Sequence, residues 1–375
     1  MEHEKQYMEE KTMKKIAIML VLALVLGLFA GCAGNIVVVG DCTCPTGGHT
    51  NNPTNPQPTN PKPTDPKPTP PAPEGALKTG LAIVTSVSKS ENAKVADYDV
   101  TLVAVLVDDN GVIQDCIIDS IGAKVEFDAT GTITSDINAE VKTKNELGDA
   151  YGMVAWGGAI AEWYQQADAL AKFAIGKTVS ELKNGAIDET GKAPAGSDLA
   201  SSATIYLGGY VSAIEEAVKN AQHLGAQGGD ELRLAAIPSL KSSVSATAEK
   251  AGTAQLDCDV TALTVKDGII TSCFIDSLQA KVSFGTDGVI TTDTSAPVAT
   301  KNQLGEKYGM VAWGGAIAEW NVQAASFASY VTGKTAAQVA GIAVNEGTKP
   351  TGADLATSVT IAIGGFQALI AKALA

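Results

Sequence analysis

The sequence predicts an α+β protein with two tandem homologous domains, each an antiparallel sheet followed by packed helices. The thirteen-residue segment YGMVAWGGAIAEW occurs at residues 151–163 and recurs unchanged at 308–320, so the chain contains an internal duplication. Within each copy, strand-type alternation comes first and helical periodicity second. That order favours segregated strands and helices over a parallel α/β sheet.

Other repeated segments define the boundaries of the two copies. They pair Cys116 with Cys273, the ThrLysAsn triplet at 143–145 with 300–302, and AspLeuAla at 198–200 with 354–356. We therefore expect the first repeat over 77–222, a linker over 223–231 and the second repeat over 232–375. Each repeat has an ordinary size for a domain with its own core. The short Gly-containing linker leaves the relative orientation of the copies open.

The N-terminal segment, residues 1–31, is predicted to be a lipoprotein signal peptide. Lys14 and Lys15 precede an apolar run that ends in LFAGC at residues 28–32, which resembles a bacterial lipobox. The resemblance implies that Cys32 is acylated and anchors the chain in membrane lipid at the outer face of a bacterial cell membrane. An uncleaved anchor or a buried apolar helix is the alternative. Acidic residues ahead of Met13 indicate that translation starts at Met13.

The next segment, residues 32–76, is predicted to be a lipid-anchored linker rich in proline and threonine. Its centre reads PKPTDPKPTPP. Proline at this density fixes φ and removes backbone donors, so we expect a disordered, extended stalk of about 3.1 Å per residue. Such a stalk would hold the repeats away from the membrane.

The first half of each repeat is predicted to be mostly strand. Residues 98–107 alternate, and DDNG at 108–111 supplies a turn into a second apolar run, which predicts an antiparallel hairpin. The segments 125–127 and 132–134 flank another turn.

The second half of each repeat is predicted to be helical. One apolar face is formed by Ile160, Trp163, Ala167, Leu170 and Ala174, and in copy two by Ile317, Trp320, Ala324, Phe327 and Val331. Trp163 and Trp320 are therefore expected to pack in the core. A last helix is expected from about Gly209 to Ala221.

Composition argues against several classes of function. The net charge is −14, and Arg233 is the only arginine, so nucleic acid is a poor partner. The histidines lie outside the repeat cores, which argues against a histidine-based catalytic or metal site. A disulfide between Cys258 and Cys273 is conceivable across a hairpin, but buried free thiols are the favoured interpretation. Cys42 and Cys44 lie in the stalk.

Two glycine pairs in the duplicated block form a candidate anion site. Gly157 and Gly158, with Gly314 and Gly315 in copy two, are expected at a helix start behind Trp156 and Trp313. Backbone N–H groups at a helix start bind phosphate or carboxylate. The alternative is that the glycines only permit close packing.

A second candidate site lies near the end of each repeat. Copy one reads DLASSAT over 198–204 and copy two DLATSVT over 354–360. These segments resemble the flavinylation motif of extracytoplasmic FMN-binding domains, in which Asp and two free positions are followed by Ser or Thr, Gly, Ala and a final Thr or Ser. The resemblance implies covalent attachment of FMN by a flavin transferase to Thr204 and Thr360, with Asp198 and Asp354 opening the motif. Ser202 and Ser358 replace the glycine, and Val359 replaces the alanine.

Three functions remain open at this point. The first is a lipoprotein that transfers electrons through flavin outside the cytoplasm, to or from a membrane redox partner, with no catalytic residues of its own. The alternative is a noncovalent binding module for a small ligand or a cell-wall component. A spacer or adhesive role is the third. No nucleophile is paired with a base, so a hydrolytic enzyme is disfavoured.

Overall fold

The computed structural model describes residues 75–375, which belong to one compact unit of the chain. The predicted signal peptide, Cys32, the predicted stalk with Cys42 and Cys44, and the start at Met13 lie outside the described residues. Within them, the expected α+β class is confirmed: two three-stranded antiparallel sheets are combined with helices.

Each repeat builds one sheet in simple sequence order. The first contains β1 (Lys78–Ser86), β2 (Val95–Val107) and β3 (Ile113–Glu126), and the second contains β4 (Glu231–Ser239), β5 (Gly252–Lys266) and β6 (Ile269–Phe284). The predicted hairpin is confirmed, with Thr101 opposite Ser120. Its turn is fixed by Asp108, whose Oδ1 accepts from the backbone N–H groups of Asn110 and Val112 at 2.9 Å each. The strand β1 was not predicted, because its central apolar run does not alternate.

The second predicted turn is present, but its far side is not a strand. Phe127 and Ile133 form only an isolated bridge. Between them the backbone N–H of Gly131 donates to the carbonyl oxygen of Asp128 at 3.0 Å. Residues 132–134 therefore belong to a loop.

The helices follow the sheet in each repeat. Repeat one has α2 (Lys144–Leu147), η1 (Gly148–Tyr151), α3 (Met153–Gly157), α4 (Trp163–Ala174), α5 (Val179–Ala186), η2 (Leu199–Ser201) and α6 (Gly208–Lys219). Repeat two has α7 (Lys301–Leu304), η3 (Gly305–Tyr308), α8 (Met310–Gly314), α9 (Trp320–Val331), α10 (Ala336–Ala340), α11 (Ala353–Ala356) and α12 (Gly364–Ala373). The expected last helix of repeat one is confirmed as α6.

The predicted helix face is confirmed except at its first position. Trp163, Leu170 and Ala174 of α4 are buried, as the periodicity predicts. The prediction is wrong for Ile160, which precedes the helix and is 57% exposed. Ile317 in repeat two is exposed to the same extent. Glu162 has an extended conformation and caps the helix, so α4 begins at Trp163 and Ile160 lies outside it.

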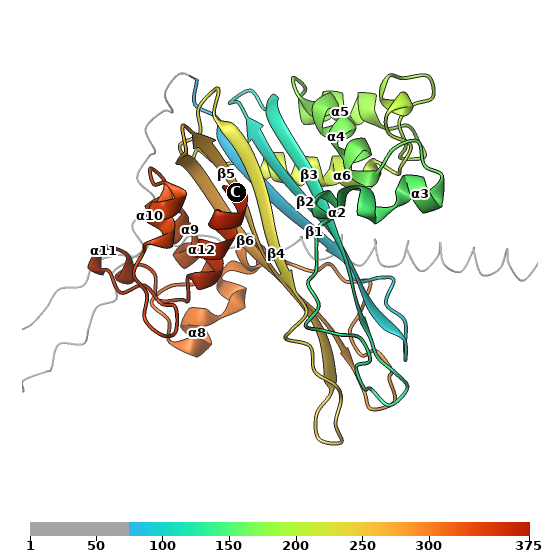
Figure 1. The fold of residues 1–375 in the computed structure, drawn as a ribbon, viewed down its shortest axis with the longest axis vertical. Helices are drawn as coiled ribbons and strands as arrows, with labels where there is room; N and C mark the ends of the chain where they lie inside the picture. The colour runs from blue at the N-terminus through green and yellow to red at the C-terminus, as the bar shows by residue number, and fades with distance from the viewer. Residues whose placement is uncertain (1–74) are drawn as a thin grey trace, which may run out of the picture. The chain divides into compact units, whose positions relative to one another are not determined.

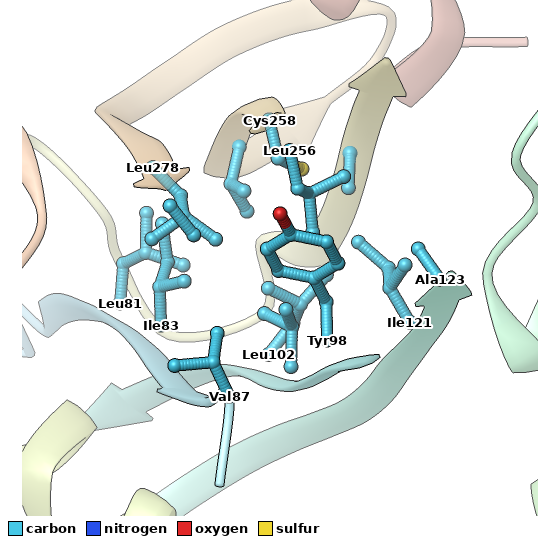
Figure 2. Close-up of a cluster of buried hydrophobic side chains, with 14 of the residues drawn as sticks. Leu81, Ile83, Val87, Tyr98, Leu102, Ile121, Ala123, Leu256, Cys258 and Leu278 are labelled. Carbon is cyan, nitrogen blue, oxygen red and sulfur yellow. The ribbon is translucent and has the colours of Figure 1, made fainter. Parts of the chain in front are cut away.

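The inner faces of the two sheets pack against each other. One buried cluster draws on both repeats, including Tyr98, Leu102 and Ile121 from the first sheet and Leu256 and Leu278 from the second (Figure 2). At one point in this cluster the rings of Phe127 and Phe284 stack with centroids 4.0 Å apart.

The outer face of each sheet is covered by the helices of its own repeat. In repeat one, α4, α5 and α6 form a second buried cluster with outward residues of the sheet, such as Val103 and Ile118. In repeat two, α9, α10 and α12 do the same with Leu263 and Ile275. The strands thus lie between two helical layers (Figure 1).

Residues of the expected linker run along the start of β1. The backbone N–H of Leu77 donates to the carbonyl oxygen of Ala226, and that of Thr79 to Gln222, at 2.9 Å each. Asp230 closes a turn by accepting from the N–H of Gln227 at 2.9 Å. These bonds connect the end of repeat one to its own first strand.

The cysteines of the described residues are buried free thiols, which confirms the favoured interpretation. Cys258 belongs to the cluster between the sheets, whereas Cys273 belongs to the cluster under the helices. They point to opposite faces of one sheet and do not pair. Burial raises the pKa of Cys273 to about 12 and raises that of Cys116 further, so both are unreactive thiols.

Candidate functional site

The duplicated block forms a short helix that begins and ends at glycine. In repeat one, Gly152 precedes α3 with φ of 80° and Gly158 follows it with φ of 61°, both left-handed conformations that favour glycine. The prediction that the glycine pairs start a helix is wrong: Gly157 and Gly158 end α3, and Gly314 and Gly315 end α8. Because a helix C-terminus presents carbonyl groups, this end does not offer the N–H groups that bind an anion.

The N-terminus of the same helix already holds a carboxylate from the chain. Glu162 accepts from the backbone N–H of Met153 at 2.8 Å and from that of Val154 at 2.9 Å. In repeat two Glu319 makes the same bonds to Met310 and Val311, at 2.8 and 3.0 Å. Both glutamates are buried. The backbone N–H groups at the start of this helix are therefore already bonded to a side chain of the protein.

The block exposes its first tryptophan and buries its second. Trp156 is 84% exposed and Trp313 is 91% exposed, whereas Trp163 and Trp320 lie in the core. The ring of Trp156 rests on Gly152, where an added Cβ would lie 2.5 Å from its Cε3 atom. The duplicated block therefore displays one large aromatic ring to solvent at the same place in both repeats.

The candidate acceptor threonines lie on turns that a buried glutamine fixes. The Oε1 atom of Gln166 accepts from the backbone N–H of Thr204 at 2.8 Å, from that of Ile205 at 3.2 Å and from the Thr204 hydroxyl at 3.3 Å. Its Nε2 atom donates to the carbonyl oxygen of Ala161 at 2.8 Å. One amide thus joins the threonine turn to the end of the duplicated block.

Repeat two reproduces this arrangement. Gln323 accepts from the backbone N–H and hydroxyl of Thr360 at 2.8 and 3.2 Å and donates to Ala318 at 2.7 Å. Thr204 is exposed and Thr360 is half-buried. The structure therefore brings the two sequence-predicted regions together in each repeat. Gln166 and Gln323 were not predicted as site residues, although the sequence places the same polar residue beside the apolar helix face in both repeats.

The aspartates that open the motif are separated from the threonines by a short helical segment. Asp198 precedes η2 and Asp354 lies in the first turn of α11, and both side chains are exposed. Between the motif ends, Ser202 has φ of −116° and ψ of −22°. Serine adopts this conformation without strain, so its replacement of glycine does not distort the turn.

A third repeated constellation lies beside the buried tryptophans. In repeat two, Asp276 accepts from the backbone N–H groups of Ser277 at 2.7 Å and Asn302 at 3.0 Å, and Thr300 caps α7. In repeat one Asp119 accepts likewise from Ser120 and Asn145. Burial raises the pKa of both carboxyl groups, that of Asp276 to about 6. These aspartates hold the first helix of each repeat against its sheet.

A lysine beside each aspartate lies over two aromatic rings. Lys144 Nζ is 5.0 Å from the ring centroid of Trp163 and 5.2 Å from that of Tyr151. Lys301 has the same relation to Trp320 and Tyr308, at 4.9 and 5.3 Å. These cation–π contacts connect the ThrLysAsn triplet at 143–145 to the duplicated block. The triplet and the block, both identical in the two repeats, therefore contact each other in the folded protein.

Neither a metal cluster nor a membrane-spanning helix occurs in residues 75–375. No group of three or more His, Cys, Asp or Glu side chains in this range is arranged to hold a metal ion. No helix in the same range has the length and apolar character needed to cross a bilayer.

Comparison with known proteins found no matching family model, curated protein or solved structure.

Proposed function

We propose that the chain is a cell-surface lipoprotein with two tandem homologous FMN-binding-like domains, which carries electrons outside the cytoplasm. In this proposal the domains follow a signal peptide and a stalk, and acylated Cys32 anchors them to membrane lipid. A flavin transferase and a membrane redox partner serve them. FMN is held as a phosphoester on Thr204 and Thr360.

One observation carries the proposal. In both repeats the last threonine of the motif lies on an ordered turn that one buried glutamine joins to the block with the exposed tryptophan. Thr204 Oγ1 donates to Gln166 at 3.3 Å, so the hydroxyl has a fixed direction. The transferase would take FMN from a flavin dinucleotide: the Thr204 oxygen bonds to the FMN phosphorus, the pyrophosphate bond breaks, and the nucleoside monophosphate leaves with the hydroxyl proton. The φ of Ser202 fits the motif without glycine.

Exposed aromatic side chains occur in both segments that Gln166 joins. Trp156 is 84% exposed and Tyr206 is 59% exposed, and each belongs to one of the two segments that Gln166 joins. Exposed aromatic rings stack on planar ligands. Bound FMN would supply reversible one- and two-electron chemistry, whereas the chain would supply attachment, orientation and partial cover.

Co-expression with a flavin transferase tests the covalent attachment. We expect the intact mass to rise by two esterified FMN groups, and the denatured protein to fluoresce on a gel. Thr204→Ala and Thr360→Ala should each remove one group, and the double variant both. Thr204→Ser, which keeps the hydroxyl, should retain its flavin. An unmodified mass for the wild-type chain would exclude covalent attachment.

A noncovalent binding module is the second candidate, favoured by the 84% and 91% exposure of Trp156 and Trp313. Titration of unmodified protein with FMN, riboflavin and cell-wall fragments tests it, with tryptophan fluorescence as the readout. Trp156→Ala with Trp313→Ala should abolish the response. Tight FMN binding would support flavin, and binding of wall fragments alone would support the module without redox activity.

A further inference from the structure

A large cleft lies between the two repeats, away from the threonine turns of repeat one. Its volume is about 1150 Å³. Small-molecule sites commonly enclose about 300–1,000 Å³, so this cleft has room for a ligand of several rings. One wall is the outer side of α9 with part of β6, and the opposite wall is the segment after α6, including Gln222 and Leu224.

The wall formed by α9 differs from the matching surface of repeat one. Part of the core-facing side is identical: Trp163, Gln166 and Ala167 of α4 correspond to Trp320, Gln323 and Ala324 of α9, while Leu170 and Ala174 are replaced by the larger apolar Phe327 and Val331. On the outer side repeat one has bulky or charged residues where repeat two has small, neutral ones. The pairs are Tyr164 with Asn321, Asp168 with Ala325 and Lys172 with Ser329.

In repeat one these outer residues make an ordinary solvated helix surface. Lys172 Nζ pairs with Asp168 at 2.6 Å, and the Tyr164 hydroxyl donates to Asp149 at 3.2 Å. Asn321, Ala325 and Ser329, at the same places in repeat two, form neither of these contacts and line the cleft. These exchanges remove the charged pair and the tyrosine ring of repeat one from the surface that lines the cleft in repeat two.

The chemistry of the lining selects the class of ligand. Lysine and arginine are absent from it, so an anionic ligand would find no counter-charge. Its two charged or titratable side chains other than Cys273 are already engaged: Asp276 accepts two backbone N–H groups, and His223 bonds to Asp109 at 2.9 Å. The remaining polar groups are amides and hydroxyls, which both donate and accept.

Two further groups suit a sugar. Phe274 contributes a half-buried aromatic ring to the lining, a surface on which the apolar face of a pyranose can pack. Asn321 Oδ1 is buried in the wall with no hydrogen-bond partner among the described residues. Rotation of this side chain toward a ligand would therefore gain a hydrogen bond without breaking one at that oxygen.

We propose that the cleft between α9 and the segment after α6 binds a neutral oligosaccharide. Thr204, Thr360 and the exposed tryptophans do not line the cleft, although Ser358, two residues before Thr360, does. The site requires no flavin.

The test is calorimetric titration of the full chain with the tetramer of N-acetylglucosamine and with cellotetraose. We expect binding of at least one of them. Ala325→Asp with Ser329→Lys, which places the charged pair of repeat one in the cleft, should weaken it about tenfold or more. Asp168→Ala with Lys172→Ser, the reverse exchange on α4, should leave it unchanged.

Several results would overturn the proposal. These are no binding of either saccharide, binding that survives the exchange on α9, and binding that instead disappears with Trp156→Ala and Trp313→Ala. If the exchange on α9 prevents folding, Asn321→Tyr takes its place, because tyrosine already occupies that position in repeat one. Thr204→Ala with Thr360→Ala should leave the affinity unaltered, which separates this site from the flavin proposal.

Discussion

Several positions that are identical in the two repeats are single buried polar residues. Gln166, Glu162 and Asp119, with their counterparts in repeat two, each bond to at least two backbone groups, and at least one of these belongs to another segment. A buried donor or acceptor left unpaired costs about 1–3 kcal/mol, so the residue that satisfies several of them is hard to replace. These positions thus specify how loops meet the sheets.

Asp276 should make stability depend on pH between about 4 and 7. Burial raises the pKa of its carboxyl group to about 6, whereas the unfolded chain titrates near 3.9. Between these values the folded state keeps a proton that the unfolded chain has lost, so this group's contribution to stability falls as pH rises. The stability of wild type relative to Asp276→Asn should fall by up to about 3 kcal/mol from pH 4 to pH 7.

Urea denaturation of both proteins across this range is the measurement. Asparagine keeps an oxygen that can accept from Ser277 and Asn302, so the variant should fold. A difference in unfolding free energy that is constant with pH would contradict the raised pKa.

At the scale of elements, the short helices depend on caps rather than on length. α2 and α7 have only four residues each, and both begin with a threonine capping box, at Thr143 and Thr300. Isolated helices of this length are not stable, so side chains that bond to the free N–H groups are needed. The five-residue helices α3 and α8 depend instead on the distant carboxylates of Glu162 and Glu319.

Glu162→Gln should loosen α3. The amide presents one oxygen where the carboxylate presents two, so one of the N–H groups of Met153 and Val154 loses its partner. We expect a loss of about 1–2 kcal/mol in unfolding free energy and faster hydrogen exchange over residues 151–158. Glu319→Gln should have the same effect on α8, and unchanged exchange in both variants would contradict this role.

At the scale of the whole described unit, the two repeats are stabilised together. The cluster between the sheets contains residues from all six strands, and the stack of Phe127 on Phe284 joins one repeat to the other. Further bonds cross this boundary, such as that from the N–H of Ile133 to Ser245 Oγ at 3.0 Å. Loss of packing in one repeat should therefore affect both.

Phe127→Ala and Phe284→Ala should each lower the unfolding free energy by about 3–5 kcal/mol, because each leaves a cavity between the sheets. We expect one shared unfolding transition, seen equally by probes near Trp163 and near Trp320. Trp313→Ala is the matched control: the side chain is 91% exposed, so its loss should leave stability unchanged. Two separate transitions in Phe127→Ala would show that the repeats unfold independently.

The sequence alone determined the duplication, the α+β class, the β2–β3 hairpin and the buried face of α4. These follow from identity, from alternation and from helical period, which are local properties of the chain. The motif ending at Thr204 and Thr360 was also visible in the sequence, whereas attachment of FMN there stays a prediction.

Only the tertiary structure decided what covers each surface. The strand β2 is buried on both faces along residues 102–107, and no local pattern says that helices cover one face while the other repeat covers the second. Similarly, one sequence block buries Trp163 and exposes Trp156, because left-handed Gly158 ends α3 and turns the chain before α4 begins. Burial results from contacts between segments far apart in the sequence, so only the folded arrangement could show that the duplicated block displays one tryptophan in each repeat and that a buried glutamine links the block to each candidate threonine.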